Sequence, residues 1–269
     1  MSGAEDGEWQ LGGPNVRRPD FGLKIWGYRI AGVLMLSAAW EMAADAGVLN
    51  LLFFGVPSGI LQFAWNGLFI ERFLLVDTYF TIQATLLAFG LGSATGVLAG
   101  LLFVAYPAVE EFFEPFTAAL NALPRIALAP LFLLWFGLGL AFKVALGTSL
   151  SFFILLSSTI AGARSVNPDH LVLLRTLGAN RLQFFIIVVL PGAVPTVFSG
   201  LRLGLIYSLL GVVTAELLAS RAGLGQRISF LAGTFNTNGV FAVLLVLAVI
   251  GGLLSGAMNF LERWLLRWR

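Results

Sequence analysis

The chain contains no cysteine and only one histidine among its 269 residues. It can therefore form no disulfide, hold no thiolate-bound metal and build no cluster of imidazole ligands, and we expect no metal site. Charged residues are also scarce, at 11% against roughly 25% in soluble domains. The net charge of only +2 gives no reason to expect nucleic acid as a partner.

Catalytic motifs are absent as well. The sequence has no H-E-x-x-H, no G-x-S-x-G and no phosphate-binding G-x-x-x-x-G-K-[ST] loop. We therefore expect no enzyme: the chain cannot hydrolyse ATP by that route, and it binds no cofactor of its own.

Hydrophobic residues, in contrast, make up 58% of the chain, and the mean hydropathy is +0.91. This composition predicts an all-α membrane protein that crosses the bilayer several times. With about 20 apolar residues needed per crossing, we predict six transmembrane helices. They lie at roughly 27–48, 78–105, 115–137, 140–162, 194–218 and 239–261.

The remaining segments organise the chain around these crossings. Residues 1–24 are polar and contain no apolar core, so they are predicted to be a cytoplasmic tail rather than a signal peptide. Residues 25–269 are predicted to form one transmembrane domain. Residues 49–77, with Pro57, Ser58 and Gly59 as a turn signal, are placed as an interfacial segment outside.

The basic residues set the orientation, because they concentrate in cytoplasmic segments. With both termini inside, ten basic residues lie on the cytoplasmic side and four outside; the resemblance described below implies that the membrane is the plasma (bacterial inner) membrane. The inside residues are Arg17, Arg18, Lys24, Arg29, Arg164, Arg175, Arg181, Arg263, Arg267 and Arg269, and the outside ones are Arg72, Lys143, Arg221 and Arg227.

A short polar helix interrupts the apolar sequence after Asn167. Asn167 is a good N-cap, Pro168 suits the first helical position, Asp169 faces the positive end of the helix dipole, and Gly178 suits a left-handed stop. One face carries Leu171, Leu174 and Leu177, with Arg175 elsewhere. Such a helix is too short to span a bilayer, so we predict that it docks on a partner.

Glycines at four-residue spacing indicate close helix packing. The pattern occurs at Gly92, Gly96 and Gly100, at Gly200 and Gly204, and at Gly252 and Gly256. Packing within one subunit is the simpler interpretation, and a seam between two subunits is the alternative.

Polar groups inside the predicted spans are candidates for a translocation path. Pro124 and Pro130 interrupt the third span, and Asn121 and Arg125 lie beside the break, which favours a path over a harmless kink. Glu216 is an acid within the fifth span, either paired structurally or active in transport. The candidate path residues are Asn121, Pro124, Arg125, Ser208, Thr214 and Glu216.

The run RTLGANRLQFFIIVVLPGAVP resembles the cytoplasmic loop signature of ABC importer permeases: an EAA triplet, three residues, a glycine, nine residues, then I-x-L-P. Gly178 takes the glycine position, and Leu190 and Pro191 take the last two. The triplet itself reads Val172, Leu173 and Leu174, so the family's glutamate is absent. The segments ALPRIALAPLFLLWFGLG, GLRLGLIYSLLGVVTAELLASRAGLGQRI and NFLERWLL are similar to the nitrate/sulfonate/taurine (bicarbonate)-type branch, over approximately residues 57–265.

This resemblance implies a type I ABC importer permease fold. It also implies a second permease copy, expected to make a homodimer, two cytoplasmic ATPase subunits that bind ATP and Mg, and an external substrate-binding protein. The loop at about 163–193 would hold the coupling helix. The residues expected to couple to the ATPase are Asn167, Pro168, Asp169, Leu171, Leu174, Arg175, Leu177, Gly178, Ala179, Leu190 and Pro191.

The expected function is the permease subunit of an ATP-driven importer, which forms the path for nitrate, a sulfonate such as taurine, or a related small organic compound. Two alternatives come from other classes. One is an ion-coupled secondary transporter, although the chain has few buried acids and no visible inverted repeat. The other is a non-catalytic membrane scaffold subunit or a membrane-embedded enzyme, and the lack of a catalytic cluster disfavours the enzyme.

Overall fold

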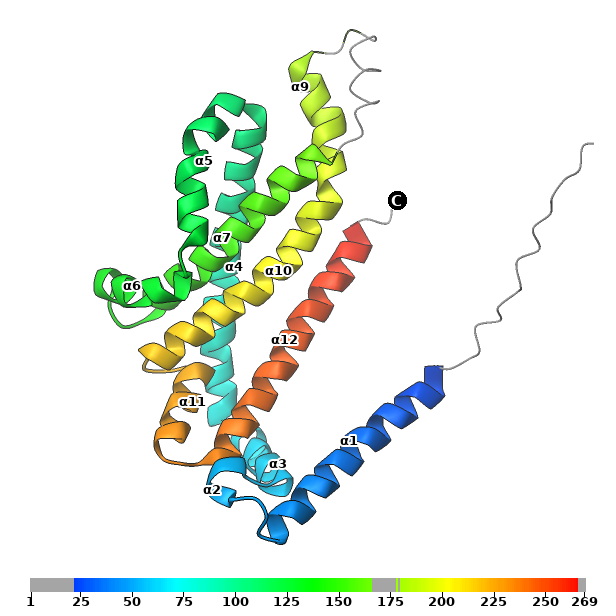
Figure 1. Cartoon of the computed structure of the whole chain (residues 1–269), viewed down its shortest axis with the longest axis vertical. Helices are drawn as coiled ribbons and strands as arrows, with labels where there is room; N and C mark the ends of the chain where they lie inside the picture. Colours follow the sequence, from blue (N-terminus) through cyan, green and yellow to red (C-terminus); the bar gives the residue numbers. More distant parts are fainter. Residues whose placement is uncertain (1–21, 166–177, 179, 266–269) are drawn as a thin grey trace, which may run out of the picture. The chain divides into compact units, whose positions relative to one another are not determined.

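Figure 1 shows the computed structural model of the chain, which describes residues 22–165, 178 and 180–265, with only the backbone for residues 22–26, 181 and 182. The described part is helical and contains no β-strand, which confirms the all-α fold class. The chain divides into two units, Met1–Leu49 and Asn50–Arg269, each of which is described by itself.

The first unit contains one helix, α1, at Gly22–Asp45. It begins inside the predicted tail and covers most of the first predicted crossing at 27–48. However, α1 is not among the helices that are long and apolar enough to cross a membrane. Its apolar run is interrupted by charges at Arg29, Glu41 and Asp45. The helix therefore forms, but its apolar stretch is shorter than a regular membrane span requires.

Four helices in the second unit have the length and apolarity of membrane spans. They are α4 (Phe73–Ala105), α7 (Leu140–Arg164), α10 (Leu190–Leu218) and α12 (Thr237–Leu265). A short helix α9 (Arg181–Phe184) and a π-helix η3 (Phe185–Val189) lead directly into α10. The predicted second, fourth, fifth and sixth spans are therefore confirmed.

The third predicted span, at 115–137, is interrupted, as its prolines predict. It is divided into α5 (Pro107–Ala122), a 3-10 turn η2 (Arg125–Leu128) and α6 (Ala129–Phe136), with a bend of 88°. Pro124 causes the break, because the residue before a proline disfavours helical backbone, and Leu123 is extended at φ −71° and ψ 132°. The described residues thus hold four spans, or five if this bent pair is one, and not the six predicted.

Residues 49–77 contain no span but are helical, with α2 (Leu51–Phe54), α3 (Pro57–Trp65) and a π-helix η1 (Asn66–Ile70) before α4. The turn predicted at Pro57 is wrong, because Pro57 begins α3, where a missing N–H costs nothing. The backbone N–H of Val56 donates to the side chain of Asn238 at 2.8 Å, which attaches this corner to α12. A further helix, α11 (Leu224–Gly233), connects α10 to α12.

Glycines allow α4 and α7 to touch along their backbones. A Cβ at Gly92 would lie 2.0 Å from the Ser151 hydroxyl, and one at Gly96 would lie 2.5 Å from the Phe152 carbonyl oxygen. Gly100 faces Thr159 in the same way. The prediction of close packing within one subunit is confirmed here.

The other two glycine pairs differ from each other. Gly200 and Gly204 of α10 contact Ser158 and Leu155 of α7, so this pair also packs within the subunit. Gly252 of α12 has no atom within 4 Å of its Cβ position among the described residues, and neither has Gly256. Packing within the subunit is therefore not confirmed for these two by the described residues, and both interpretations stay predictions for them.

The glycine contacts generate a stability prediction. Replacing Gly96→Ala should lower the free energy of unfolding by about 1–3 kcal/mol, since backbone atoms of α7 must move to admit the methyl group. The midpoint of thermal unfolding in detergent measures this effect. Gly252→Ala is the matched control and should leave the midpoint unchanged or slightly raised. Equal destabilisation by both changes would contradict the packing described here.

Candidate functional site

The predicted docking helix cannot be compared with the structure. Its residues Asn167, Pro168, Asp169, Leu171, Leu174, Arg175 and Leu177, together with Ala179, lie outside the described residues. Gly178 is described, is exposed, and has φ +77°, which is the left-handed backbone predicted for the stop. A residue with a Cβ is strained in this conformation, so the glycine has a conformational reason to be there.

A capping box at Asn180 and Gln183 begins the helix that follows this loop. The N–H of Asn180 donates to the side chain of Gln183 at 2.9 Å, and the N–H of Gln183 donates to the side chain of Asn180 at 2.8 Å. Leu190 and Pro191 are exposed and form the first turn of α10. Pro191 has no N–H to donate within the helix, and the wider π-helix η3 immediately precedes α10.

Three of the predicted path residues come together at the break between α5 and α6. The Arg125 guanidinium donates to the side-chain oxygen of Asn121 across the turn that Pro124 creates. The same guanidinium lies 4.3 Å from the centre of the Phe153 ring on α7. Arg125 thus holds the broken helix against α7 through a hydrogen bond and a cation–π contact.

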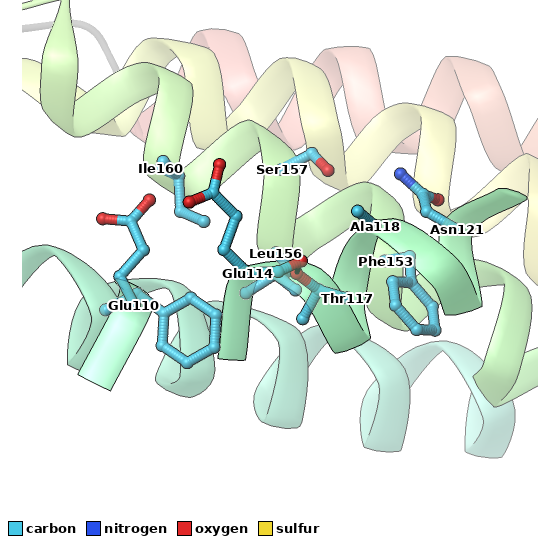
Figure 2. Close-up of a pocket in the computed structure, with 10 residues that line it drawn as sticks. Glu110, Glu114, Thr117, Ala118, Asn121, Phe153, Leu156, Ser157 and Ile160 are labelled. Carbon is cyan, nitrogen blue, oxygen red and sulfur yellow. Dashed lines mark hydrogen bonds between the residues drawn. The ribbon is translucent and has the colours of Figure 1, made fainter. Parts of the chain in front are cut away.

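A polar cavity of about 150 Å³ adjoins this break between α5 and α7 (Figure 2). Its walls combine acids, neutral polar side chains and apolar side chains. The lining residues are Glu110, Glu114, Thr117, Ala118 and Asn121 of α5, Phe153, Leu156, Ser157 and Ile160 of α7, and Phe103 of α4. Of the predicted path residues, Asn121 alone lines this cavity.

The sequence contained a signal for this cavity that the prediction of path residues missed. Glu110, Glu114, Thr117 and Asn121 follow at intervals of four, three and four residues, which places them on one face of α5. A neighbouring groove of about 490 Å³ is lined by aromatic residues of the same helix, among them Phe112, Phe113 and Phe116. The helix is therefore amphipathic inside an apolar chain, and such a polar face marks a functional surface.

The Glu110 side chain also joins the cavity to the end of α7. Arg164 donates to both carboxylate oxygens of Glu110, at 2.6 and 2.7 Å. Arg164 is the last residue of α7. A displacement of this helix end would therefore be transmitted directly to a residue that lines the cavity.

The other predicted path residues lie elsewhere. Ser208 is fully buried on α10, and its hydroxyl has no hydrogen-bond partner among the residues described. Thr214 donates to the Leu210 carbonyl of its own helix at 2.7 Å. Neither residue lines the cavity, and neither does Glu216.

Glu216 is instead the centre of a buried ionic cluster. Its side chain is 1% exposed, and its carboxylate accepts a hydrogen bond of 2.9 Å from the ammonium group of Lys143 on α7. Thr81 of α4 donates to both carboxylate oxygens, at 2.9 and 3.1 Å. The N–H of Gly225 donates as well, at 2.9 Å. The interpretation of Glu216 as a structurally paired acid is therefore supported by four hydrogen bonds.

A second ion pair extends the cluster to α11. Arg227 donates to Asp77 of α4 at 2.7 Å. The N–H of Gly223 also donates to Asp77, and the N–H of Leu224 donates to the Thr81 hydroxyl at 2.9 Å. Side chains of α4 and α10 thus satisfy the first N–H groups of α11, which a helix cannot satisfy by itself.

Lys143, one of the four basic residues expected on the outer side, is a buried charge. It lies in the first turn of α7, is 5% exposed and also donates to the Ala222 carbonyl at 2.6 Å. The signal for this pairing was available. Lys143 is the only charge of α7 before Arg164, and Glu216 is the only acid of α10, while buried charges require partners of opposite sign.

Comparison with known sequences identifies related proteins. Residues 92–267 match the family model of the binding-protein-dependent transport system inner membrane component. The chain is 34% identical to the formylaminopyrimidine transport permease protein ThiX of Halalkalibacterium halodurans, over 88% of this chain and 93% of the relative. It is 29% identical to the taurine transport system permease protein TauC of Escherichia coli K12, over 89% and 88%.

Solved structures show the same fold at lower identity. A chain of an inward-facing MetNI methionine ABC transporter superposes with a TM-score of 0.62 at 20% identity, covering 72% of this chain and 96% of that one. The corresponding chain of an amino acid ABC transporter gives a TM-score of 0.60 at 16% identity, covering 74% and 95%. The expected importer permease fold is confirmed.

The buried cluster predicts a strong thermodynamic coupling. Glu216→Gln and Lys143→Met should each lower the free energy of unfolding by about 3–5 kcal/mol, because each leaves one buried charge without its partner. The double variant should be less destabilised than the sum of the two, as a double-mutant cycle of unfolding midpoints in detergent would show. Glu110→Gln, which breaks a partly exposed pair, should cost less than about 1 kcal/mol. Simple additivity at Lys143 and Glu216 would contradict the pairing.

Proposed function

The chain belongs to the family of binding-protein-dependent transport system inner membrane components and is the transmembrane permease subunit of an ABC importer; on this premise we propose that α5, α6 and α7 border the path of a small solute that an external binding protein delivers. The observation that carries the proposal is the polar cavity beside the broken helix pair. Interrupted helices in membranes are tolerated where they are buried or line a water-filled cavity.

The solute belongs to the small organic compounds in this proposal. A cavity of about 150 Å³ suits a compact solute rather than a polymer. The named substrates of two relatives, taurine and formylaminopyrimidine, are both of this kind. Sulfonates and pyrimidines are therefore the first compounds to test, with nitrate as the smallest member of the classes that the sequence suggests.

Energy comes from separate ATPase subunits, which bind ATP and Mg, and two copies of this chain enclose the path. The loop at about 163–193 docks on the ATPase through its short helix, with both chain termini on the cytoplasmic side. Gly178 supports this role, because its left-handed backbone is the conformation that the predicted helix stop requires. The Arg164–Glu110 pair supports it too, since Arg164 ends α7 at the start of the loop and Glu110 lines the cavity.

Movement of the loop would act on α7 from one end while the ionic cluster fixes the other end. Lys143 lies in the first turn of α7 and Arg164 in its last. Figure 1 shows the same arrangement for α10, with α9 at one end and α11 at the other. Both helices can therefore tilt about the cluster as rigid rods and open or close the break between α5 and α6.

The direct test of this function is ATP hydrolysis by the chain reconstituted in lipid with its ATPase. A binding protein loaded with its solute should stimulate hydrolysis, and the solute that does so identifies the substrate. The unloaded binding protein is the control and should give little stimulation. Failure of an intact chain to assemble with the ATPase would contradict the proposed partnership.

A change at Gly178 tests the coupling loop. Gly178→Val should abolish stimulated hydrolysis and uptake, because a β-branched residue is strained by about 1–2 kcal/mol or more in left-handed backbone. Gly178→Asn should retain most of both activities, since asparagine tolerates this conformation. The measurement is uptake per ATP hydrolysed in proteoliposomes. Full activity of the valine variant would exclude a structural role of this stop in coupling.

A further inference from the structure

Glu114 is the one charged group of the cavity without a compensating partner in the described structure. Glu110 is paired with Arg164, and Arg125 beside the cavity is engaged by Asn121 and by the Phe153 ring. The Glu114 carboxylate makes no ion pair or hydrogen bond with any residue in the described ranges. The cavity therefore carries an unbalanced negative charge.

The placement of Glu114 directs this charge at the space between the helices. Figure 2 shows the carboxylate leaving α5 toward α7, between Ile160 and Ser157. Glu114 also lies within the bent helix pair that has the apolarity of a span. A carboxylate in such a segment is expensive, so its retention calls for a function.

The other lining groups define which solute would balance this charge. Ser157, Thr117 and Asn121 offer hydroxyl and amide groups, and Phe103 and Phe153 add aromatic walls. A protonated amine can pair with a carboxylate, donate to hydroxyl oxygens and approach an aromatic face. A solute with only negative charge would meet repulsion from Glu114 instead.

We propose that Glu114 selects the solute by charge, so that the path of this permease takes small solutes with a protonated amino group in preference to purely anionic ones. This inference rests on the proposed function of the cavity as part of the path. Within the compound classes named above, it favours an aminosulfonate or an amino-substituted ring over nitrate or a simple sulfonate. It makes Glu114 a specificity-determining residue.

The absence of cysteine in this chain makes the cavity charge measurable directly. A single thiol introduced by Ser157→Cys would lie in the cavity wall. Its reaction with a cationic trimethylammonium methanethiosulfonate reagent and with the anionic sulfonate reagent is followed by the intact mass of this chain, in the permease–ATPase complex in lipid. The ratio of the two rates reports the local potential, since the ionised fraction of the thiol affects both rates alike.

With Glu114 present, the cationic reagent should be preferred about tenfold or more over the anionic one, relative to a free thiol in solution. Adding Glu114→Gln should reduce this preference to within about threefold of the free thiol. Glu111→Gln is the matched control, because Glu111 and Glu114 are both exposed on α5 but Glu111 does not line the cavity. It should leave the preference intact. No cation preference, or one that survives Glu114→Gln, would overturn the proposal.

The solute class is tested by protection of the same thiol. An excess of 2-aminoethanesulfonate should slow modification by the cationic reagent, whereas 2-hydroxyethanesulfonate, which replaces the amino group by a hydroxyl, should not. The protection should disappear with Glu114→Gln. Equal protection by both compounds, or by neither, would overturn the solute assignment.

These experiments distinguish failure of the importer path from failure of charge selection by Glu114. Stimulated ATP hydrolysis without a cation preference would refute charge selection and leave the importer path in place. A cation preference without any stimulated hydrolysis would refute the ATPase partnership and leave the charged cavity in place.

Discussion

The arrangement of the helices depends on one buried ion pair, between Lys143 and Glu216. Two charges removed from water are stable only when they are paired and their remaining hydrogen-bonding positions are filled. Thr81, Gly225 and Ala222 fill those positions, and they belong to α4, to α11 and to the loop between α10 and α11. The requirement to satisfy this pair therefore brings the ends of four helices to a single place, and the Asp77–Arg227 pair adds a second connection between α4 and α11.

The opposite half of the bundle is built differently. Glycines bring α4, α7 and α10 into backbone contact, whereas the polar contacts that hold α5 to α7, through Arg125 and through the Glu110–Arg164 pair, are partly or largely exposed. Beyond the break at Pro124, α6 joins a buried apolar cluster with Phe142 and Ala215, next to the ionic cluster. Exposed ion pairs contribute little to stability and can be rearranged at small cost. The helices are thus held rigidly at the Lys143–Glu216 cluster and adjustably at the contacts of Arg125 and Arg164. This combination suits a subunit whose path must open and close, and the polar cavity lies beside the adjustable contacts.

The sequence predicted what depends on local composition and missed what depends on neighbours. Long apolar runs identified α4, α7, α10 and α12, and Pro124 marked the break. Both signals were readable because an apolar run and a proline determine the structure at their own positions in the chain. Identical glycine spacing was confirmed as packing within the subunit for Gly96 but not for Gly252, since the pattern does not say whether a helix lies opposite. Pro57 suited both a turn and a helix start. The pairing of Lys143 with Glu216 was missed because the two residues are 73 positions apart in the chain.

The most direct test of the account is a cryo-EM structure of this chain assembled with its ATPase and solute-loaded binding protein in lipid. The account predicts that two copies face each other across a path bordered by Glu114, Asn121 and Ser157, that the segment after Asn167 lies in a groove of the ATPase, and that the Lys143–Glu216 pair is unchanged. A structure in which the face of α5 that carries Glu114 contacts only lipid, away from the path between the two copies, would contradict it.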